Sequence, residues 1–247
     1  FLVCDADVAG GTGTNLFRAT YPGRFFQFGI AEQNMMCSAA GLNIATGLPI
    51  FVTGFATFLM RGWEMARLSI DYPCINVKVV ASHGGVDVGP DSHSAMGLED
   101  FACWRTLPNF VVISPSSPAQ MKAATKAVLE YKGPVYMRSG RSPWNEMPFE
   151  GEFKIGKSYT LREGNDIAII ATGKMVWYAL RAAELLYASR GIHARVIDFP
   201  TLKPVDHSAI LSCCNEVKFI VTYEDHGRFG GLSDAVGNSV LQTRHPI

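Results

Sequence analysis

Short apolar runs rich in β-branched residues alternate along the chain with longer segments in which apolar residues recur at helical spacing. This alternation predicts parallel strands joined by crossover helices, which is an α/β fold. In the first part of the chain, strands are expected at residues 1–5, 24–29, 50–54, 75–82, 110–114 and 135–139. Helices are expected at residues 31–46, 58–70 and 117–130. We therefore predict a six-stranded, doubly wound parallel-sheet domain.

A segment without long periodicity, residues 142–163, separates this pattern from a second one. It holds two prolines and four aromatic residues, which is typical of a strap between compact units. Beyond it, strands are expected at 166–171, 194–199 and 219–223, and helices at 176–189, 206–214 and 231–241. This predicts domains at 1–145 and 146–247, the second a smaller α/β domain. Because no strand is expected after its last helix, we expect this domain to be truncated.

Composition and charge exclude several classes of partner. The 247 residues include 22 Lys and Arg against 22 Asp and Glu, so the formal net charge is zero. A balanced charge offers no electrostatic attraction to nucleic acid or to an anionic membrane, and no apolar stretch is long enough to span a bilayer. The six cysteines lack zinc-site spacing and are predicted to be reduced, buried thiols. Without a targeting or lipidation motif, the expected compartment is the cytoplasm.

Candidate chemistry is expected where the predicted strands end, because ligands of open parallel sheets lie beyond the carboxyl ends of the strands. Glu32 follows one apolar strand directly and opens the next helix. One interpretation is an acidic residue in the first helical turn, stabilised by the helix dipole. The other is a desolvated acid that shares a proton with a ring nitrogen of a ligand. Its position alone leaves both interpretations open.

Residues 28–35, Phe-Gly-Ile-Ala-Glu-Gln-Asn-Met, favour the second interpretation because they resemble a segment of the transketolase-like thiamine diphosphate enzymes. The resemblance covers essentially the whole chain in order and spacing. It includes Asp-Ala-Asp-Val at 5–8, Gly-Phe-Ala-Thr-Phe-Leu at 54–59, the His83 loop, Arg-Ser-Gly-Arg-Ser-Pro at 138–143, and Glu-Asp-His at 224–226 before Gly-Gly-Leu at 230–232. It implies a pyrimidine-binding domain at 1–145 and a transketolase C-terminal domain at 146–247.

The resemblance also implies how the cofactor would be held. The family's glutamate at the position of Glu32 bonds the aminopyrimidine ring nitrogen and favours the imino tautomer, which makes Glu32 a catalytic and cofactor-binding candidate. Phe55 and Phe58 match aromatic residues that flank this ring, although two aromatics at this spacing are by themselves more typical of a core. Asp7 matches an aspartate near the cofactor. A small shift of register would give that place to Asp5.

The glycine-rich loop at residues 82–93 is expected to face the substrate. Glycines allow close approach of the backbone to a ligand, and histidine titrates near neutrality. The resemblance implies that His83 and Asp91 contact sugar hydroxyl or phosphate groups. The structural alternatives are a helix cap for Asp91 and a surface turn at Ser92 and His93. This chain has Ala95 where the family commonly has another histidine. Either His93 takes over its catalytic role or the acceptor is a different one.

Two arginines are candidates for binding the substrate phosphate. Arg141 matches a phosphate-binding arginine of the family, and a planar guanidinium suits bidentate phosphate binding. Arg61 resembles an arginine of the deoxyxylulose phosphate synthase branch. Either side chain could instead be a cation at a strand end or on a helix face. We assign no chemical step to His226.

One half of the expected cofactor site has no match in the sequence. The family binds the diphosphate and its metal with a Gly-Asp-Gly segment followed by an Asn, and the residues at 164–166 are no substitute. We predict no metal ligands in this chain. Mg²⁺ or Ca²⁺ would be held mainly by a separate N-terminal subunit in an α₂β₂ assembly. A chain whose upstream part has been removed would show the same sequence.

The leading hypothesis is therefore the C-terminal subunit of a split transketolase-like enzyme, which transfers a two-carbon ketol unit from a ketose phosphate. One alternative keeps the cofactor chemistry but changes the acceptor. This subunit would resemble deoxyxylulose phosphate synthase or the dehydrogenase E1 β subunit and pass an acyl unit to a lipoyl or carrier-protein arm. Another alternative is a non-catalytic companion subunit. No nucleic-acid or membrane partner is expected.

Overall fold

The computed structural model describes residues 1–242 of the chain, and these form two compact units. The first comprises Phe1–Val112 and Val128–Pro143, and the second comprises Ile113–Ala127 and the chain from Trp144 onward. Both units combine helices with a mainly parallel sheet, which confirms the predicted α/β class. The predicted truncation concerns the chain after Gln242, which lies outside the described residues.

The strands and helices agree with most of the predicted ranges. The strands are β1 Leu2–Asp5, β2 Phe25–Gln27, β3 Ile50–Phe55, β4 Val77–Ser82, β5 Val111–Ile113, β6 Val135–Arg138, β7 Tyr159–Arg162, β8 Ile167–Ala171, β9 Ala194–Asp198, β10 Thr201–Lys203 and β11 Phe219–Tyr223. The helices are α1 Ala9–Thr12, α2 Asn15–Thr20, α3 Glu32–Thr46, α4 Ala56–Leu59, α5 Trp63–Ala66, α6 Asp100–Arg105, α7 Pro118–Glu130, α8 Met175–Arg190, α9 His207–Glu216 and α10 Leu232–Gln242.

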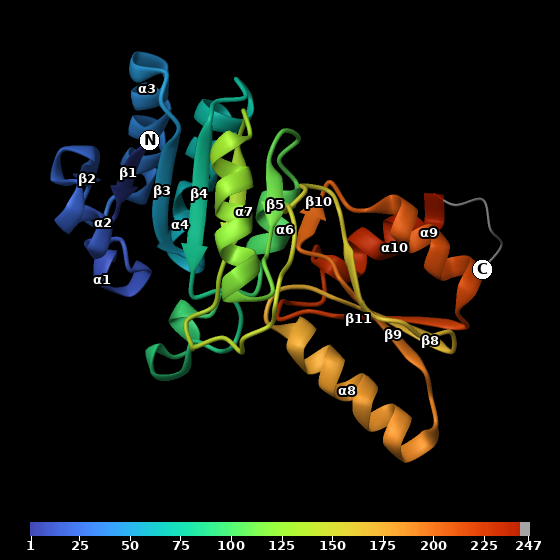
Figure 1. The fold of residues 1–247 in the computed structure, drawn as a ribbon. Coiled ribbons are helices and arrows are strands. Elements are labelled where there is room, and N and C mark those ends of the chain that lie inside the picture. Colours follow the sequence, from blue (N-terminus) through green and yellow to red (C-terminus); the bar gives the residue numbers. More distant parts are fainter. Residues whose placement is uncertain (243–247) are drawn as a thin grey trace. The chain divides into compact units, whose positions relative to one another are not determined.

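Parallel register in the first unit brings several strand ends to one edge of the sheet. Its six strands have the order β5-β6-β4-β3-β1-β2, and Figure 1 shows β1, β3 and β4 side by side. Asp5 pairs with Thr53, and Phe55 pairs with Ser82. All four residues of β1 and of β6 are buried, as expected for parallel strands covered on both faces. The segments that follow these strands therefore meet at the same edge.

The prediction of one continuous helix at residues 58–70 is wrong. The structure has α4, a 3₁₀ turn at Met60–Gly62, α5 and a π-helical turn at Arg67–Asp71 instead. Gly62 lies against the first turn of α3, where an added Cβ would be 2.7 Å from Met36 Cγ and 3.1 Å from the Glu32 carbonyl oxygen. Glycine also has a low helix propensity. The close approach to α3 therefore places a glycine, and a break, inside the predicted helix.

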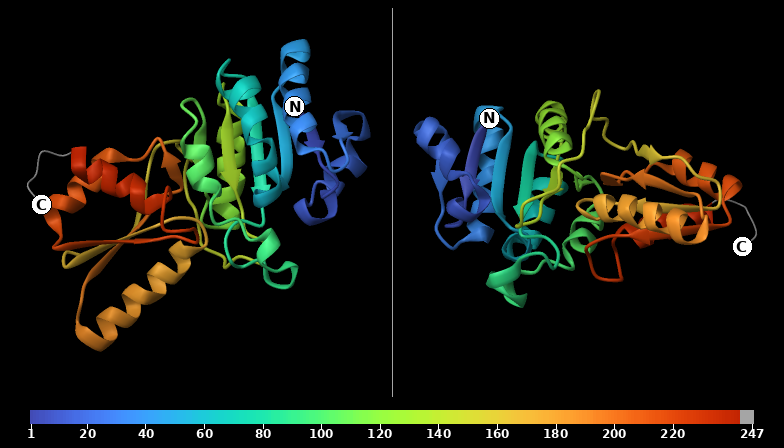
Figure 2. Two further views of the ribbon diagram at one scale, coloured as in Figure 1. Left: turned by 180° about the vertical axis from the view of Figure 1, so that it is seen from behind. Right: turned by 60° about the horizontal axis from the view of Figure 1, so that its bottom comes forward.

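The second unit is built on a smaller sheet with the order β11-β8-β9-β7. β8 pairs in parallel with both β9 and β11, whereas β7 is antiparallel to β9. α8 covers one face, and α9 and α10 cover the other (Figures 1 and 2). The core between α8 and the sheet includes Ile169, Val176, Ala179, Ala183 and Val196. The sequence missed β7, which lies inside the predicted strap at 142–163.

The cysteines are free, as predicted, but they are not uniformly buried. Cys4 and Cys213 are buried, while Cys37 and Cys74 are exposed, so the prediction of buried thiols is wrong for these two. Burial raises the pKa of the Cys4 thiol to about 12. Among residues 1–242, no helix combines the length and apolar character needed to cross a bilayer.

A buried carboxyl group joins the end of β9 to the segment before α7. Asp198 is 1% exposed, and its Oδ2 accepts hydrogen bonds of 2.7 Å from Ser116 Oγ and from Gln120 Nε2. Desolvation disfavours the ionised form more than these two donors favour it. Burial therefore raises the pKa of Asp198 to about 7.

Replacing Asp198 with asparagine is expected to flatten the pH dependence of stability. The folded chain holds the Asp198 proton up to a pKa of about 7, whereas an unfolded aspartate loses it near pH 3.8. The contribution of Asp198 to the free energy of unfolding therefore falls by a few kcal/mol as the pH rises between these values, and stays constant above them. Asparagine can accept the same two hydrogen bonds without titrating. Urea unfolding across this range measures the slope, and equal slopes for both proteins would contradict the assignment.

Candidate functional site

Glu32 is buried at the first position of α3, as predicted. Glu32 is 5% exposed, and it follows Ala31, whose backbone has a non-helical conformation. Among residues 1–242, the Glu32 carboxylate has no hydrogen-bond or ion-pair partner. It borders a pocket of about 380 Å³, whose other lining residues are Ile30, Ala31, Gln33 and Arg61. A buried carboxylate that opens into a pocket is able to bond a polar ligand.

Stacked rings lead from this pocket to the glycine-rich loop. The guanidinium carbon of Arg61 lies 5.7 Å from the ring centroid of Phe58. The Phe58 ring is 5.1 Å from that of Phe55, which stacks on His83 with centroids 3.5 Å apart. Behind Phe55, only glycine fits at Gly11, because a Cβ there would be 2.7 Å from the ring. The structure thus brings the predicted aromatic residues and His83 together.

His83 forms a polar cluster with two other predicted residues. Its Nε2 lies 3.3 Å from Asp91 Oδ2, and the same oxygen lies 2.6 Å from Arg141 Nε. The other ring nitrogen, Nδ1, shares a hydrogen bond of 2.9 Å with Ser82 Oγ. Burial lowers the pKa of His83, although the Asp91 carboxylate opposes this shift. His83 is therefore largely neutral at pH 7, as a proton acceptor must be.

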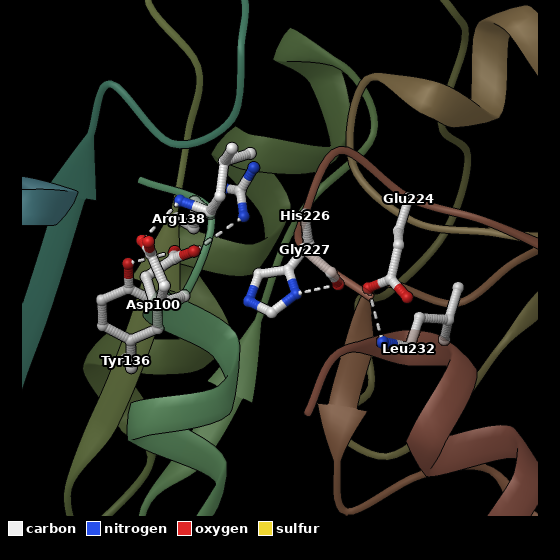
Figure 3. Close-up of polar contacts among 9 residues, drawn as sticks. Asp100, Tyr136, Arg138, Glu224, His226, Gly227 and Leu232 are labelled. Carbon is white, nitrogen blue, oxygen red and sulfur yellow. Dashed lines mark hydrogen bonds and ion pairs between the residues drawn. The ribbon is translucent and has the colours of Figure 1, made fainter. Parts of the chain in front are cut away.

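A buried ion pair that the sequence did not reveal supports the backbone next to His83. Arg138 Nη1 donates to Asp100 Oδ1 at 3.0 Å, and Tyr136 Oη donates to Asp100 Oδ2 at 2.6 Å (Figure 3). Burial and the nearby Asp100 hold the pKa of Tyr136 well above its usual range, so the phenol remains a donor. A Cβ at Gly84 would lie 2.0 Å from Arg138 Nε. The fixed guanidinium therefore packs directly against the backbone of the glycine-rich loop.

Two predicted site residues lie at the surface. His93 is exposed, and among the described residues its ring bonds only the adjacent Ser92, at 3.2 Å. Asp7 is also exposed and has a left-handed backbone with φ of 64°, whereas Asp5 is completely buried. The roles of His93 and Asp7 remain predictions.

In the second unit, the Glu-Asp-His and Gly-Gly-Leu motifs form a helix cap. The Glu224 carboxylate accepts a hydrogen bond of 2.6 Å from the backbone N–H of Leu232 (Figure 3). It accepts another, of 2.8 Å, from the backbone N–H of Ser233. These are unpaired donors at the beginning of α10. A Cβ at Gly231 would lie 2.1 Å from Glu224 Oε2, which explains the glycine. The His226 ring bonds the Gly227 carbonyl oxygen at 2.8 Å. The motif thus has a structural role.

Comparison with known proteins gives the family. The profile "Transketolase, pyrimidine binding domain" matches residues 1–145, and "Transketolase, C-terminal domain" matches residues 156–246. A Methanocaldococcus jannaschii protein named "Putative transketolase C-terminal section" is 43% identical over 97% of this chain and 75% of its own. A protein of Phocaeicola vulgatus, named as one subunit of an apulose-4-phosphate transketolase, is 35% identical over 98% of this chain and 78% of its own.

A solved structure gives the same result at the level of the fold. It is described as "Split gene transketolase, inactive beta4 tetramer" and is 41% identical to this chain. The match has a TM-score of 0.89 and covers 100% of this chain and 80% of the other. This chain therefore belongs to the transketolase family, of which it carries the pyrimidine-binding and C-terminal domains.

Proposed function

We propose that this chain is the C-terminal subunit of a split transketolase. With thiamine diphosphate, the assembled enzyme transfers a two-carbon ketol unit from a ketose phosphate to an aldehyde acceptor. The observation that carries this proposal is the buried Glu32 carboxylate, which opens into a pocket and is continuous with the predicted aromatic and polar residues through Arg61 and Phe58.

Membership of the transketolase family implies thiamine diphosphate, and the first unit suits the pyrimidine half of this cofactor. Glu32 offers a desolvated carboxylate that can hold a proton at a ring nitrogen, and its pocket is within the usual range of small-molecule sites. Phe55 and Phe58 offer apolar ring surface that excludes water. When bound, the cofactor supplies the electron sink for carbon–carbon bond cleavage.

The diphosphate half is proposed to reside on a second polypeptide. Within residues 1–242, no three His, Cys, Asp or Glu side chains gather in a group that could hold a metal ion. A diphosphate needs Mg²⁺ or Ca²⁺ with oxygen ligands. The names of the relatives support this division, because the Phocaeicola vulgatus protein is named as one subunit of its enzyme and one solved assembly of β chains is described as inactive. We propose an α₂β₂ enzyme in which an N-terminal subunit holds the metal and the diphosphate.

The cluster around His83 is proposed to receive the substrate. Neutral His83 can accept a proton from a sugar hydroxyl, and Asp91 can accept a hydrogen bond from another. Arg141 is 37% exposed, which leaves its guanidinium accessible to a phosphate. Arg61, which lines the pocket, and His93, which is exposed in the glycine-rich loop, are proposed as further substrate contacts. The Phocaeicola vulgatus relative is named for a phosphorylated ketose, which supports an anionic donor.

The proposal is tested by assaying the chain together with an N-terminal transketolase subunit from the same genome, thiamine diphosphate and Mg²⁺. A panel of ketose phosphates with aldehyde acceptors is expected to release aldose phosphate, and only when both chains are present. Turnover that requires pyruvate or a carrier thiol would replace this function with the deoxyxylulose phosphate synthase-like or dehydrogenase-like one. An assembled complex without any turnover would leave the companion-subunit hypothesis.

A further inference from the structure

Asp5 is a buried carboxylate at the centre of a partly buried hydrogen-bond network at the carboxyl end of β1. Asp5 has no exposed surface. Oδ2 accepts hydrogen bonds from the hydroxyl groups of Thr12 at 3.3 Å, Thr14 at 3.2 Å and Thr53 at 3.0 Å, while Oδ1 accepts one from the Val8 backbone N–H at 2.9 Å. Three of these donors lie in the segment that contains α1, and the fourth lies in β3. One carboxylate therefore ties the start of the chain to the strand that carries Phe55.

Gln27 extends this network to the backbone at Asp7 and at Gly29, the second of which leads into α3. Its Nε2 donates to Asp5 Oδ1 at 3.3 Å, which fixes the orientation of the side-chain amide. The oxygen of the same amide, Oε1, accepts hydrogen bonds from the backbone N–H groups of Asp7 at 2.8 Å and of Gly29 at 3.1 Å. Both residues have a left-handed backbone, with φ of 64° for Asp7 and 65° for Gly29.

The two left-handed residues control where predicted site residues lie. A non-glycine residue at positive φ is disfavoured by contacts of its Cβ, so Asp7 needs support from its surroundings. Gly29 comes three residues before Glu32, and its carbonyl oxygen accepts a hydrogen bond from the Ala31 N–H at 2.8 Å. The position of Gly29 therefore sets how the chain enters α3.

We propose that Asp5 and Gln27 act together as the positioning residues of the pyrimidine pocket. Asp5 orients the Gln27 amide, and Gln27 fixes the turns at Asp7 and Gly29 so that Glu32 is presented at the first position of α3. The proposal rests on the proposed function for the chemical roles of Asp7 and Glu32, but the network itself is independent of it. Neither Asp5 nor Gln27 is placed in contact with cofactor or substrate.

Two variants of Gln27 test the roles of its side-chain amide, which donates through Nε2 and accepts through Oε1. Gln27→Met removes both the donor and the acceptor while keeping a side chain of similar length. Gln27→Glu keeps an acceptor for the two N–H groups but places a second carboxylate next to that of Asp5, which repels it. Asp71→Leu is the matched control, because Asp71 is also buried and leucine cannot accept the hydrogen bonds that Asp71 Oδ1 receives from the N–H groups of Asn109 and Phe110.

The first measurement is amide hydrogen exchange of the full chain without cofactor. Gln27→Met is expected to accelerate exchange at Asp7 and Gly29 by roughly tenfold and to leave Asn109 and Phe110 unchanged. Asp71→Leu is expected to give the opposite pattern. Unchanged exchange at Asp7 and Gly29 in Gln27→Met would overturn the proposal whether or not the proposed function is correct.

The second measurement uses the assembled enzyme. Both Gln27 variants are expected to raise the KM for thiamine diphosphate and to lower kcat at saturating cofactor by roughly tenfold, since a misplaced acid impairs proton transfer. Asp71→Leu is expected to change neither constant, although it lowers the unfolding midpoint. Equal effects of Asp71→Leu and Gln27→Met on KM would reduce the network to general stability and overturn the positioning role. Failure of the unchanged enzyme to turn over would count against the proposed function alone.

Discussion

Replacing Glu32 with glutamine is expected to lower kcat of the assembled enzyme by a factor of about 100 or more, because proton transfer by a positioned side chain contributes at least that much. Glutamine has nearly the same shape as glutamate, but its amide cannot take up and return a proton. The Glu32 site is buried, and a neutral side chain is easier to desolvate than a carboxylate. The variant should therefore fold at least as well as the unchanged chain.

Steady-state kinetics with saturating thiamine diphosphate and a ketose phosphate measure this effect, together with calorimetric titration of the cofactor. Glu64→Gln is the matched control, since Glu64 is an exposed residue of α5 and does not line the pocket. The control should retain full activity. If Glu32→Gln also turns over at the normal rate, Glu32 is only a helix-start residue and the proposed mechanism is wrong.

The spacing of apolar residues predicted most of the helices and strands, because each of these elements carries its own local sequence signal. The apolar run of β3 and the long segment of α3, which is rich in Ala and Met and has no proline, are examples of such signals. The break at Gly62 could not be predicted, because its cause is close contact with Glu32 and Met36 on another helix. β7 was missed for a related reason. It is an antiparallel edge strand with half-exposed residues, and β9, with which it pairs, is distant in sequence.

The candidate site divides in the same way. Glu32, Phe55 and His83 stand in recognisable motifs at or near the ends of strands, so a sequence comparison finds them. Asp5 and Asp100 act through partners that are far apart in sequence, such as Gln27 and Arg138, and no spacing rule connects these pairs. Motifs therefore indicated the residues for which we propose a chemical role, whereas the contacts that hold them in place required the structure.

Replacing Arg138 with methionine is expected to destabilise the chain by about 3–5 kcal/mol, the usual result of removing one partner of a buried ion pair. Asp100 has no exposed surface, and its carboxylate would lose the guanidinium that lies 3.0 Å away. Arg138 also packs over the Phe101 ring, with its guanidinium carbon 4.2 Å from the centroid. Methionine retains part of this apolar contact, so the loss is mainly electrostatic. Urea unfolding monitored by circular dichroism measures the change.

A double variant separates the charge effect from general disruption of the core. Arg138→Met combined with Asp100→Asn removes both charges, so it is expected to be more stable than Arg138→Met alone, because desolvating an uncompensated carboxylate is the dominant cost. As a surface comparison, Arg181→Met removes the exposed partner of Glu184 and should cost less than about 1 kcal/mol. If the double variant is the less stable of the two, loss of packing rather than loss of the ion pair explains the effect. In that case Arg138 supports the Gly84 loop by its shape, and the charge of Asp100 has no part in holding His83 in place.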